Sequence, residues 1–229
     1  FYIFSYLQFP DQILSHMVLG SSLGVIVFSS LSSTFSHNFR GAVDWGLIKL
    51  VAPSIVVGSA IGGITAGALD SDTLQGLVAL FLVVASIQLI FEFPPPPQNP
   101  RTNLIGPVLA GGGIGWLSGV FGIGGGIFSV PYFYHRGLLM MKAIGTSAAC
   151  GIPIALAGSL SYMIIGYENI NLPENSIGYV YLPATIIVGL VSSLTAKYGV
   201  KIAHRMKQKK LRIGFAFLVM LMALNLLMR

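Results

Sequence analysis

The stretch GVFGIGGGIFSVPYF, residues 119–133, places five glycines and a proline inside a longer run, residues 102–134, that has no charged side chain. Consecutive glycines unwind a helix because they lack the side chain that restricts the backbone. In a soluble protein this cluster would indicate a phosphate-binding loop, which needs a strand before it and, in the Walker form, Lys-Ser/Thr after it. The stretch continues instead as Ile-Phe-Ser-Val, so we reject a nucleotide-binding loop.

The composition of the whole chain indicates a membrane protein. Of its 229 residues, 54% are hydrophobic and only 9% are charged, whereas a soluble domain has about 25% charged residues. Most of the uncharged runs reach the roughly 20 residues that a helix needs to cross the hydrocarbon core. The runs are continuous, without the alternation of a barrel or the charged faces of soluble helices, and they predict an all-α polytopic membrane protein. These runs are residues 17–36, 50–69, 73–91, 102–134, 143–167, 175–196 and 213–228.

The net charge of +6 comes largely from one loop, because seven of the thirteen basic residues lie between Lys197 and Arg212. A basic loop between two spans is an orientation signal for the cytoplasmic face, so we expect no nucleic-acid partner. Cys150 is the only cysteine and cannot form an internal disulfide, so we expect it to be a small packing residue.

Residues 102–134 are too long for one straight crossing, since 33 residues would form a helix of about 50 Å against a hydrocarbon core of about 30 Å. A single crossing divides the basic residues nine against four. A fold-back at the glycines divides them twelve against one, leaving only Arg229 opposite the basic loop, and this fits the positive-inside rule better. We therefore predict a fold-back, with the loop from Lys197 to Arg212 in the cytoplasm and the C-terminus outside. The side opposite the basic loop then also holds Asp11, Asp70, Asp72, Glu168 and Glu174.

Weak self-similarity divides the chain into a first repeat (residues 1–93), a Pro-rich linker (residues 94–101) and a second repeat (residues 102–229). The predicted topology makes the repeats inverted, a pattern common in secondary transporters. Each repeat is expected to contain a glycine-broken fold-back hairpin and three transmembrane helices. By this register, roughly 25 to 30 residues with a twin glycine motif are expected before Phe1. The matching segments are Gly20-Ser-Ser22 with Gly145-Thr-Ser147, Ala52-Pro53 with Leu182-Pro183, and Thr65-Ala66 with Thr195-Ala196.

Two groups of glycines have different predicted roles. Gly111, Gly115 and Gly119 recur every four residues and predict close helix packing, as do the pairs at 58 and 62 and at 63 and 67. The glycines of residues 122–126 predict a break at membrane depth, which is tolerated only when it is buried in protein or lines a wet cavity. A helix that restarts at Ile127 would present free amide groups and the positive end of its dipole, which suits an anion. A purely structural hinge is the alternative.

The residues around this break resemble a known family. GVFGIGGGIFSVPYF followed by Lys142-Ala-Ile-Gly-Thr-Ser147, with the earlier Gly20-Ser-Ser22 and the segment Gly41-Ala-Val-Asp-Trp45, is similar to the signature of the TauE/SafE family of sulfite and organosulfonate exporters. The resemblance spans essentially the whole chain. It implies an integral membrane transporter of small anions, and the substrate and the direction of transport follow from the resemblance alone.

Ten residues are candidate substrate-binding residues. The hydroxyl groups can donate hydrogen bonds to anionic oxygens, although serine and threonine also bond back to helix carbonyls. His37 can relay a proton or meet substrate at the mouth of the site, or it is an ordinary interfacial histidine, and Tyr162 falls near the corresponding place in the second repeat. The candidates are Gly122, Gly124, Gly125, Gly126, Thr146, Ser147, Ser21, Ser22, His37 and Tyr162.

These patterns favour a secondary transporter that works by alternating access, and the resemblance implies that it exports a small sulfur-containing anion (sulfite, sulfoacetate or a related organosulfonate) across a bacterial inner membrane. We expect no enzymatic activity, cofactor or metal, because no catalytic set or metal-ligand spacing is present. Coupling to an ion (proton or sodium) and simple downhill movement are both left open, as is a homo-oligomer. The alternatives are a passive anion channel and a non-transporting membrane scaffold.

Overall fold

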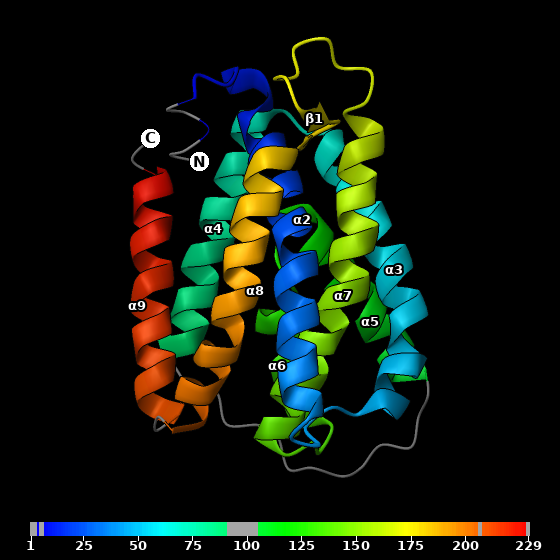
Figure 1. The fold of residues 1–229 in the computed structure, drawn as a ribbon, viewed down its shortest axis with the longest axis vertical. Coiled ribbons are helices and arrows are strands. Elements are labelled where there is room, and N and C mark those ends of the chain that lie inside the picture. The colour runs from blue at the N-terminus through cyan, green and yellow to red at the C-terminus, as the bar shows by residue number, and fades with distance from the viewer. Residues whose placement is uncertain (1–3, 5–6, 91–104, 206–207, 228–229) are drawn as a thin grey trace.

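The computed structural model describes residues 4, 7–90, 105–205 and 208–227, and this part of the chain is almost entirely helical (Figure 1). Five of its helices (α2, α3, α4, α7 and α8) are long and apolar enough to cross a membrane. The predicted all-α polytopic membrane fold is therefore confirmed. The elements are α2 (Asp11–Asn38), α3 (Trp45–Gly67), α4 (Ser71–Ile90), α5 (Ile105–Phe121), α6 (Gly126–His135), α7 (Met140–Ile165), β1 (Ser176–Ile177), β2 (Val180–Tyr181), α8 (Leu182–Arg205) and α9 (Gln208–Leu227).

Carboxylate caps fix the starts of two spans. The side chain of Asp44 accepts a hydrogen bond from the Leu47 amide at 3.0 Å at the start of α3. Asp70 accepts from the Thr73 amide at 2.8 Å at the start of α4. Both caps bond amide groups that have no partner within the helix, so they define where the chain re-enters the apolar layer.

Helix α5 runs parallel to α3. Gly111, near the start of α5, lies against Val51, and Gly119, near its end, lies against Ser59 and Gly63. Their glycines let the two backbones touch, because a methyl group on Gly115 would collide with the carbonyl oxygen of Ile55. The predicted packing role of the glycines spaced four residues apart on α5 is confirmed.

Helix α7 also runs parallel to α3. Gly145, near the start of α7, lies against Ala42 just before α3, and Gly63 and Gly67 lie against Ser161 and Ile165 near the end of α7. Because α5 and α7 both point the same way as α3, the chain reverses between them through the glycine turn and the short helix α6 (Figure 1). The structure therefore has the fold-back that charge counting predicted.

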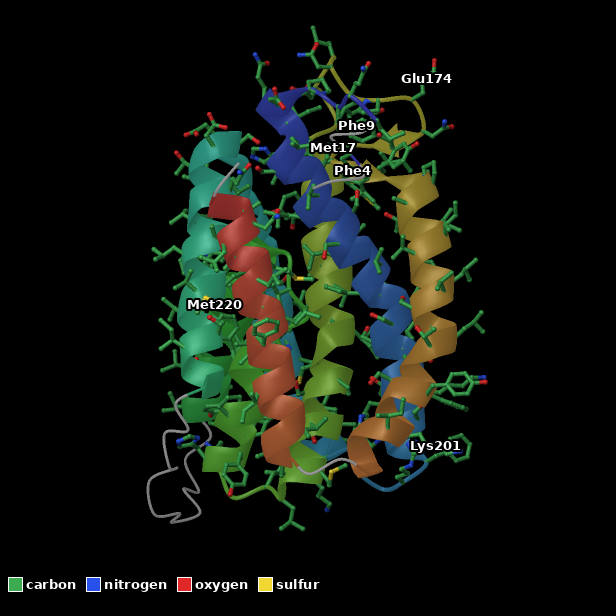
Figure 2. All side chains as sticks on the ribbon, turned by 90° about the vertical axis from the view of Figure 1, so that its left-hand side faces the viewer. Phe4, Phe9, Met17, Glu174, Lys201 and Met220 are labelled. Carbon is green, nitrogen blue, oxygen red and sulfur yellow. The ribbon has the colours of Figure 1, made fainter. Side chains whose placement is uncertain are left out.

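The fold-back separates the charges, so that the bundle has a basic end and an acidic end. The basic end holds the end of α2 and the starts of α3 and α7; Lys201 lies there, and Glu174 lies at the opposite end (Figure 2). Asp44 is the one acidic residue at the basic end among the described residues. Which end faces the cytoplasm stays a prediction. The basic end holds Arg40, Lys49, Arg136, Lys142, Lys197 and Lys201, and the acidic end holds Asp11, Asp70, Asp72, Glu168 and Glu174.

Helices that the predicted repeats pair with one another run in opposite directions. Helix α2 lies antiparallel to α7, since Gly20 lies against Tyr162 and Ser30 lies against Gly151. It lies parallel to α8, since Gly24 contacts Thr185 and, further along both helices, Ser32 Oγ donates to the Ser193 carbonyl at 2.6 Å. Opposite directions are what inverted repeats require, although the repeat itself stays a prediction. The linker at residues 94–101 lies outside the described residues.

The matched segments Gly20-Ser-Ser22 and Gly145-Thr-Ser147 make the same contact, which we call a clasp. In the first clasp, Gly20 lies against the Tyr179 carbonyl and Ser21 Oγ accepts from the Tyr181 amide at 2.9 Å, directly before α8. In the second clasp, the glycine lies against the carbonyl of Ala42. The threonine hydroxyl accepts from the backbone amide two residues after Ala42.

That amide belongs to Asp44, directly before α3, and it donates to Thr146 Oγ1 at 3.0 Å. Each clasp therefore ties one helix of a predicted repeat to a helix of the other. The matched prolines differ in place, because Pro53 lies inside α3 whereas Pro183 is the second residue of α8. If α3 and α8 are aligned by their clasps, Asp44 matches Tyr181. This alignment differs by seven residues from the one that matches Pro53 with Pro183.

Candidate anion site at the glycine turn

The break between α5 and α6 is a tight turn that requires glycine at two positions. Gly122 has φ +65° and Gly125 has φ +74°, and other residues reach this left-handed region at a cost of about 1–2 kcal/mol. The turn begins with a hydrogen bond from the Ile123 amide to the Ser118 carbonyl at 3.0 Å. The glycines therefore let the chain leave α5 and restart as a helix within four residues.

The first turn of α6 presents backbone amides without partners. The amides of Phe128 and Ser129 donate to the Gly125 carbonyl at 3.0 and 2.8 Å. The four preceding amides, from Gly124 to Ile127, find no acceptor among the described residues. Gly125 is nevertheless buried, so its orphan donor is costly unless a ligand or water accepts from it.

Serine hydroxyls from three helices surround the turn. Ser118 on α5 is fully buried, its Oγ has no partner among the described residues, and it lies 3.2 Å from where a Cβ on Gly125 would be. Ser129 Oγ on α6 donates to the Gly125 carbonyl at 2.9 Å and lies 2.6 Å from Ser147 Oγ on α7. Because the Ser129 hydrogen is used by that carbonyl, Ser147 is the donor to Ser129 in this arrangement.

Apolar side chains of α2 and α7 close the turn on two sides. A methyl group on Gly124 would lie 3.2 Å from Ile26 Cγ2, and one on Gly125 would lie 2.5 Å from Ile154 Cδ1. A methyl group on Gly126 would lie 3.8 Å from Ser147 Oγ. Ile26 and Ile154 lie near the middle of their helices, so the turn is held at about half the depth of the bundle.

The helical stretches that contact the turn carry no charge. Residues 17–36 of α2, 105–134 of α5 and α6, and 143–165 of α7 contain no Asp, Glu, Lys or Arg. The attraction for an anion therefore comes from the start of α6 and from neutral hydroxyl donors. Such donors bind an anion without the desolvation cost of a lysine buried in the membrane.

Six of the ten predicted site residues come together here: the four glycines, Ser22 and Ser147. Ser22 Oγ donates to the Gly122 carbonyl at 3.0 Å, which joins α2 to the turn. Tyr162 is buried beside them, but its hydroxyl donates to the Val120 carbonyl at 3.3 Å.

The other three predicted site residues lie elsewhere. The hydroxyl oxygens of Ser21 and Thr146 accept the backbone amides of the clasps. His37 is buried at the end of α2, where its backbone carbonyl accepts from the Ala42 amide at 3.1 Å. It belongs to the basic end of the bundle, about two helical turns beyond Ser30.

Sequence reasoning missed three residues that matter. Ser129 follows Gly126 by three residues, and this spacing within the quoted stretch is a signal that could have found it. Ser118 precedes Gly122 by four residues, about one helical turn, which is a weaker signal. His16 carries no local signal, because its partners lie on α3 and just after it, 50 and 53 residues away.

Comparison with known proteins supports one family. The family described as "Sulfite exporter TauE/SafE" matches residues 3–226. A "Probable membrane transporter protein" of Haemophilus influenzae is 30% identical over 233 residues, covering 100% of this chain and 87% of that protein. A protein of Methanocaldococcus jannaschii with the same description is 28% identical, covering 99% of this chain and 84% of that protein. No solved structure matches the chain.

Proposed function

The chain belongs to the TauE/SafE family of multi-pass membrane transporters, and we propose that it exports a small sulfur-containing anion across the inner membrane by alternating access. Sulfite, sulfoacetate and related organosulfonates are the proposed substrates. The family and the printed names of the relatives support a membrane transporter, and the substrate is inferred from the family together with the chemistry of the turn.

The observation that carries the proposal is the set of unpaired donors at the glycine turn. The buried, unpaired Ser118 hydroxyl lies next to Gly125, where the free amides at the start of α6 begin. An oxyanion of sulfur offers several oxygen acceptors on one small centre, so one ion can accept from amides and hydroxyls together. The absence of charge on the contacting stretches also favours release, because the bound ion meets no fixed counter-charge.

Alternating access is supported by the way the helices are tied together. The glycine turn lies between α2 and α7, and each of these helices is clasped to the start of a helix from the other half of the chain. One clasp joins α2 to α8 and the other joins α7 to α3. Rocking of these units about the turn would open one end of the site while closing the other.

Flux measurements with purified protein in proteoliposomes test the proposal. Sulfite, sulfoacetate and sulfate are offered separately, and external unlabelled anion is added to look for countertransport. A carrier gives saturable flux that is accelerated by anion on the opposite side. High, unsaturable conductance would instead indicate a channel, and no flux with any of these anions would leave a membrane scaffold.

A matched pair of glycine variants connects the flux to the turn. Replacing Gly124 with leucine fills the space beside Ile26, whereas replacing Gly113 with leucine adds a side chain where nothing lies within 4 Å. We expect the first variant to express and insert but to lose flux, and the second to transport normally. Normal flux in the Gly124→Leu protein would refute a substrate site at the turn.

A further inference from the structure

A buried histidine lies at the acidic end of the bundle, away from the glycine turn. His16 on α2 is 4% exposed, and its Nε2 lies 3.1 Å from the Ala66 carbonyl and 3.1 Å from the Leu69 carbonyl. Both neighbours are acceptors, so Nε2 carries a hydrogen and donates to both. The ring therefore binds one carbonyl in the last turn of α3 and one just after the helix, and the Ala66 carbonyl also accepts from the Leu69 amide at 3.1 Å.

The other ring nitrogen has no partner. Nδ1 of His16 is buried and finds no hydrogen-bond partner among the described residues. The neutral ring leaves an unpaired lone pair there, which costs less than the charged N–H donor that the protonated ring places where nothing accepts it. The packed arrangement therefore favours the neutral ring, and protonation favours an arrangement in which Nδ1 reaches water.

The contact that buries the ring is between α2 and the connection from α3 to α4. Next to His16, the Ser15 amide donates to Ser71 Oγ at 3.0 Å and Ser15 Oγ donates to the Ser71 carbonyl at 2.8 Å. The Tyr179 ring covers another side, with its centroid 4.9 Å from that of the imidazole. Water reaches Nδ1 only when these segments separate, so proton exchange and movement of α2 are linked.

The charged surroundings of His16 also lie at the acidic end. Asp70 acts on the imidazole electrostatically, and its own pKa is held below the usual range mainly by the hydrogen bond from the Thr73 amide. Asp70 therefore stays ionised near neutral pH and stabilises a proton on His16 once water can enter. The titratable groups on the segments that pack around His16 are Asp11, Asp70, Asp72, Tyr162 and Tyr179.

Resting on the proposed transport function, we infer that His16 is the proton-binding site through which transport responds to a pH gradient. The ring is neutral while α2 is packed on the α3–α4 connection, and it is protonated when the two separate and the acidic end opens. Proton binding and opening of the acidic end are then one event, which couples a pH difference to the conformational cycle.

The test compares the wild type with His16→Gln, because the glutamine amide nitrogen replaces Nε2 as donor but does not titrate. Ser15→Ala is the matched control, since it weakens the same contact and keeps the histidine. The probe is labelled sulfoacetate, whose acid groups stay ionised near neutral pH, in proteoliposomes with and without a pH gradient. We expect the gradient to accelerate wild-type and Ser15→Ala flux several-fold and to leave His16→Gln flux unchanged, with sulfoacetate exchange retained in all three.

A response to the gradient in His16→Gln, or none in the wild type, would overturn the inference while leaving anion transport in place. A wild-type protein that carries no sulfoacetate would refute that substrate first, and hydrogen–deuterium exchange then decides the proton site alone. We expect exchange at residues 11–17 and 66–73 of the wild type to rise as the pH falls, against the trend of the chemical rate. No such rise in the wild type, or the same rise in His16→Gln, would contradict the inference.

Discussion

The contact between α3 and α5 offers a prediction whose magnitude follows from the geometry. Gly115 and Gly113 lie two residues apart on α5, and alanine at either position gains about 0.5–1 kcal/mol of helix stability over glycine. A methyl group on Gly113 meets nothing within 4 Å. One on Gly115 would collide with the Ile55 carbonyl oxygen and lie 2.9 Å from the Ser59 nitrogen.

The obstructing atoms at Gly115 belong to the backbone of α3, so a change of rotamer cannot relieve the overlap and the two helices must move apart. Overpacking of this kind costs about 1–3 kcal/mol. Because the gain in helix propensity is the same at both positions, the two alanine variants should differ by that amount, with Gly115→Ala the less stable. A difference of about 2 kcal/mol corresponds to roughly thirtyfold in the folding equilibrium.

The assay is reversible unfolding in mixed detergent micelles, followed by circular dichroism and by tryptophan fluorescence, to which Trp116 on α5 and Trp45 on α3 contribute. We expect Gly113→Ala to be as stable as the wild type or slightly more stable, and Gly115→Ala to unfold at a clearly lower denaturant fraction. Equal stability of the two variants would show that α3 and α5 do not pack through their glycine backbones.

Three further predictions concern the turn, the clasps and pH. Gly125 and Gly41 both have a positive φ, so alanine at either position has the same backbone cost of about 1–2 kcal/mol. Only Gly125→Ala should lose flux, because Gly41 has open space around it. Loss of flux in both variants would show that backbone strain causes the defect. Ser118→Ala should raise the substrate concentration for half-maximal flux about tenfold or more, because it removes a buried, unpaired hydroxyl that can donate a hydrogen bond to the anion. Thr146→Ala should instead lower the melting temperature and leave that concentration unchanged, and the reverse pattern would exchange their roles. The pKa of Asp70 is depressed in the folded state, so its contribution to stability is present above the unfolded pKa of about 3.9 and is lost as the pH falls toward the folded value. The melting temperature of the wild type should therefore fall on the acid side, and that of Asp70→Asn should not show this fall. The same fall in both proteins would contradict the capping role of Asp70.

The fold was predictable because charges in a membrane protein are confined to the ends of helices. The long uncharged run at residues 102–134, taken with the basic loop near Lys201, left a fold-back as the arrangement that gathers Lys and Arg on one side. The spacing of glycines on α5 likewise predicted close packing, since a repeat of four residues puts them on one helix face. These signals are local or depend on simple counting, and both agree with the structure.

The details of the site were less accessible because they depend on contacts between distant segments. Ser21 and Tyr181 are 160 residues apart, and Thr146 and Asp44 are 102 apart, so no local pattern shows that these hydroxyls hold clasps. His16 reads in the sequence as one polar residue near the start of a span. Its role depends on the carbonyls at the end of α3 that lie next to it, and only the packing of α2 against α3 brings them there.

The central claim is that an anion binds to the backbone amides of the glycine turn, and amide chemical shifts test it most directly. Protein labelled with ¹⁵N-glycine in detergent is titrated with sulfite and, separately, with sulfoacetate, with Gly41 and Gly113 as internal references. We predict saturable downfield shifts of the Gly124, Gly125 and Gly126 amides and no shift of the references. Transport-competent protein whose turn amides do not respond to any transported anion would contradict this account.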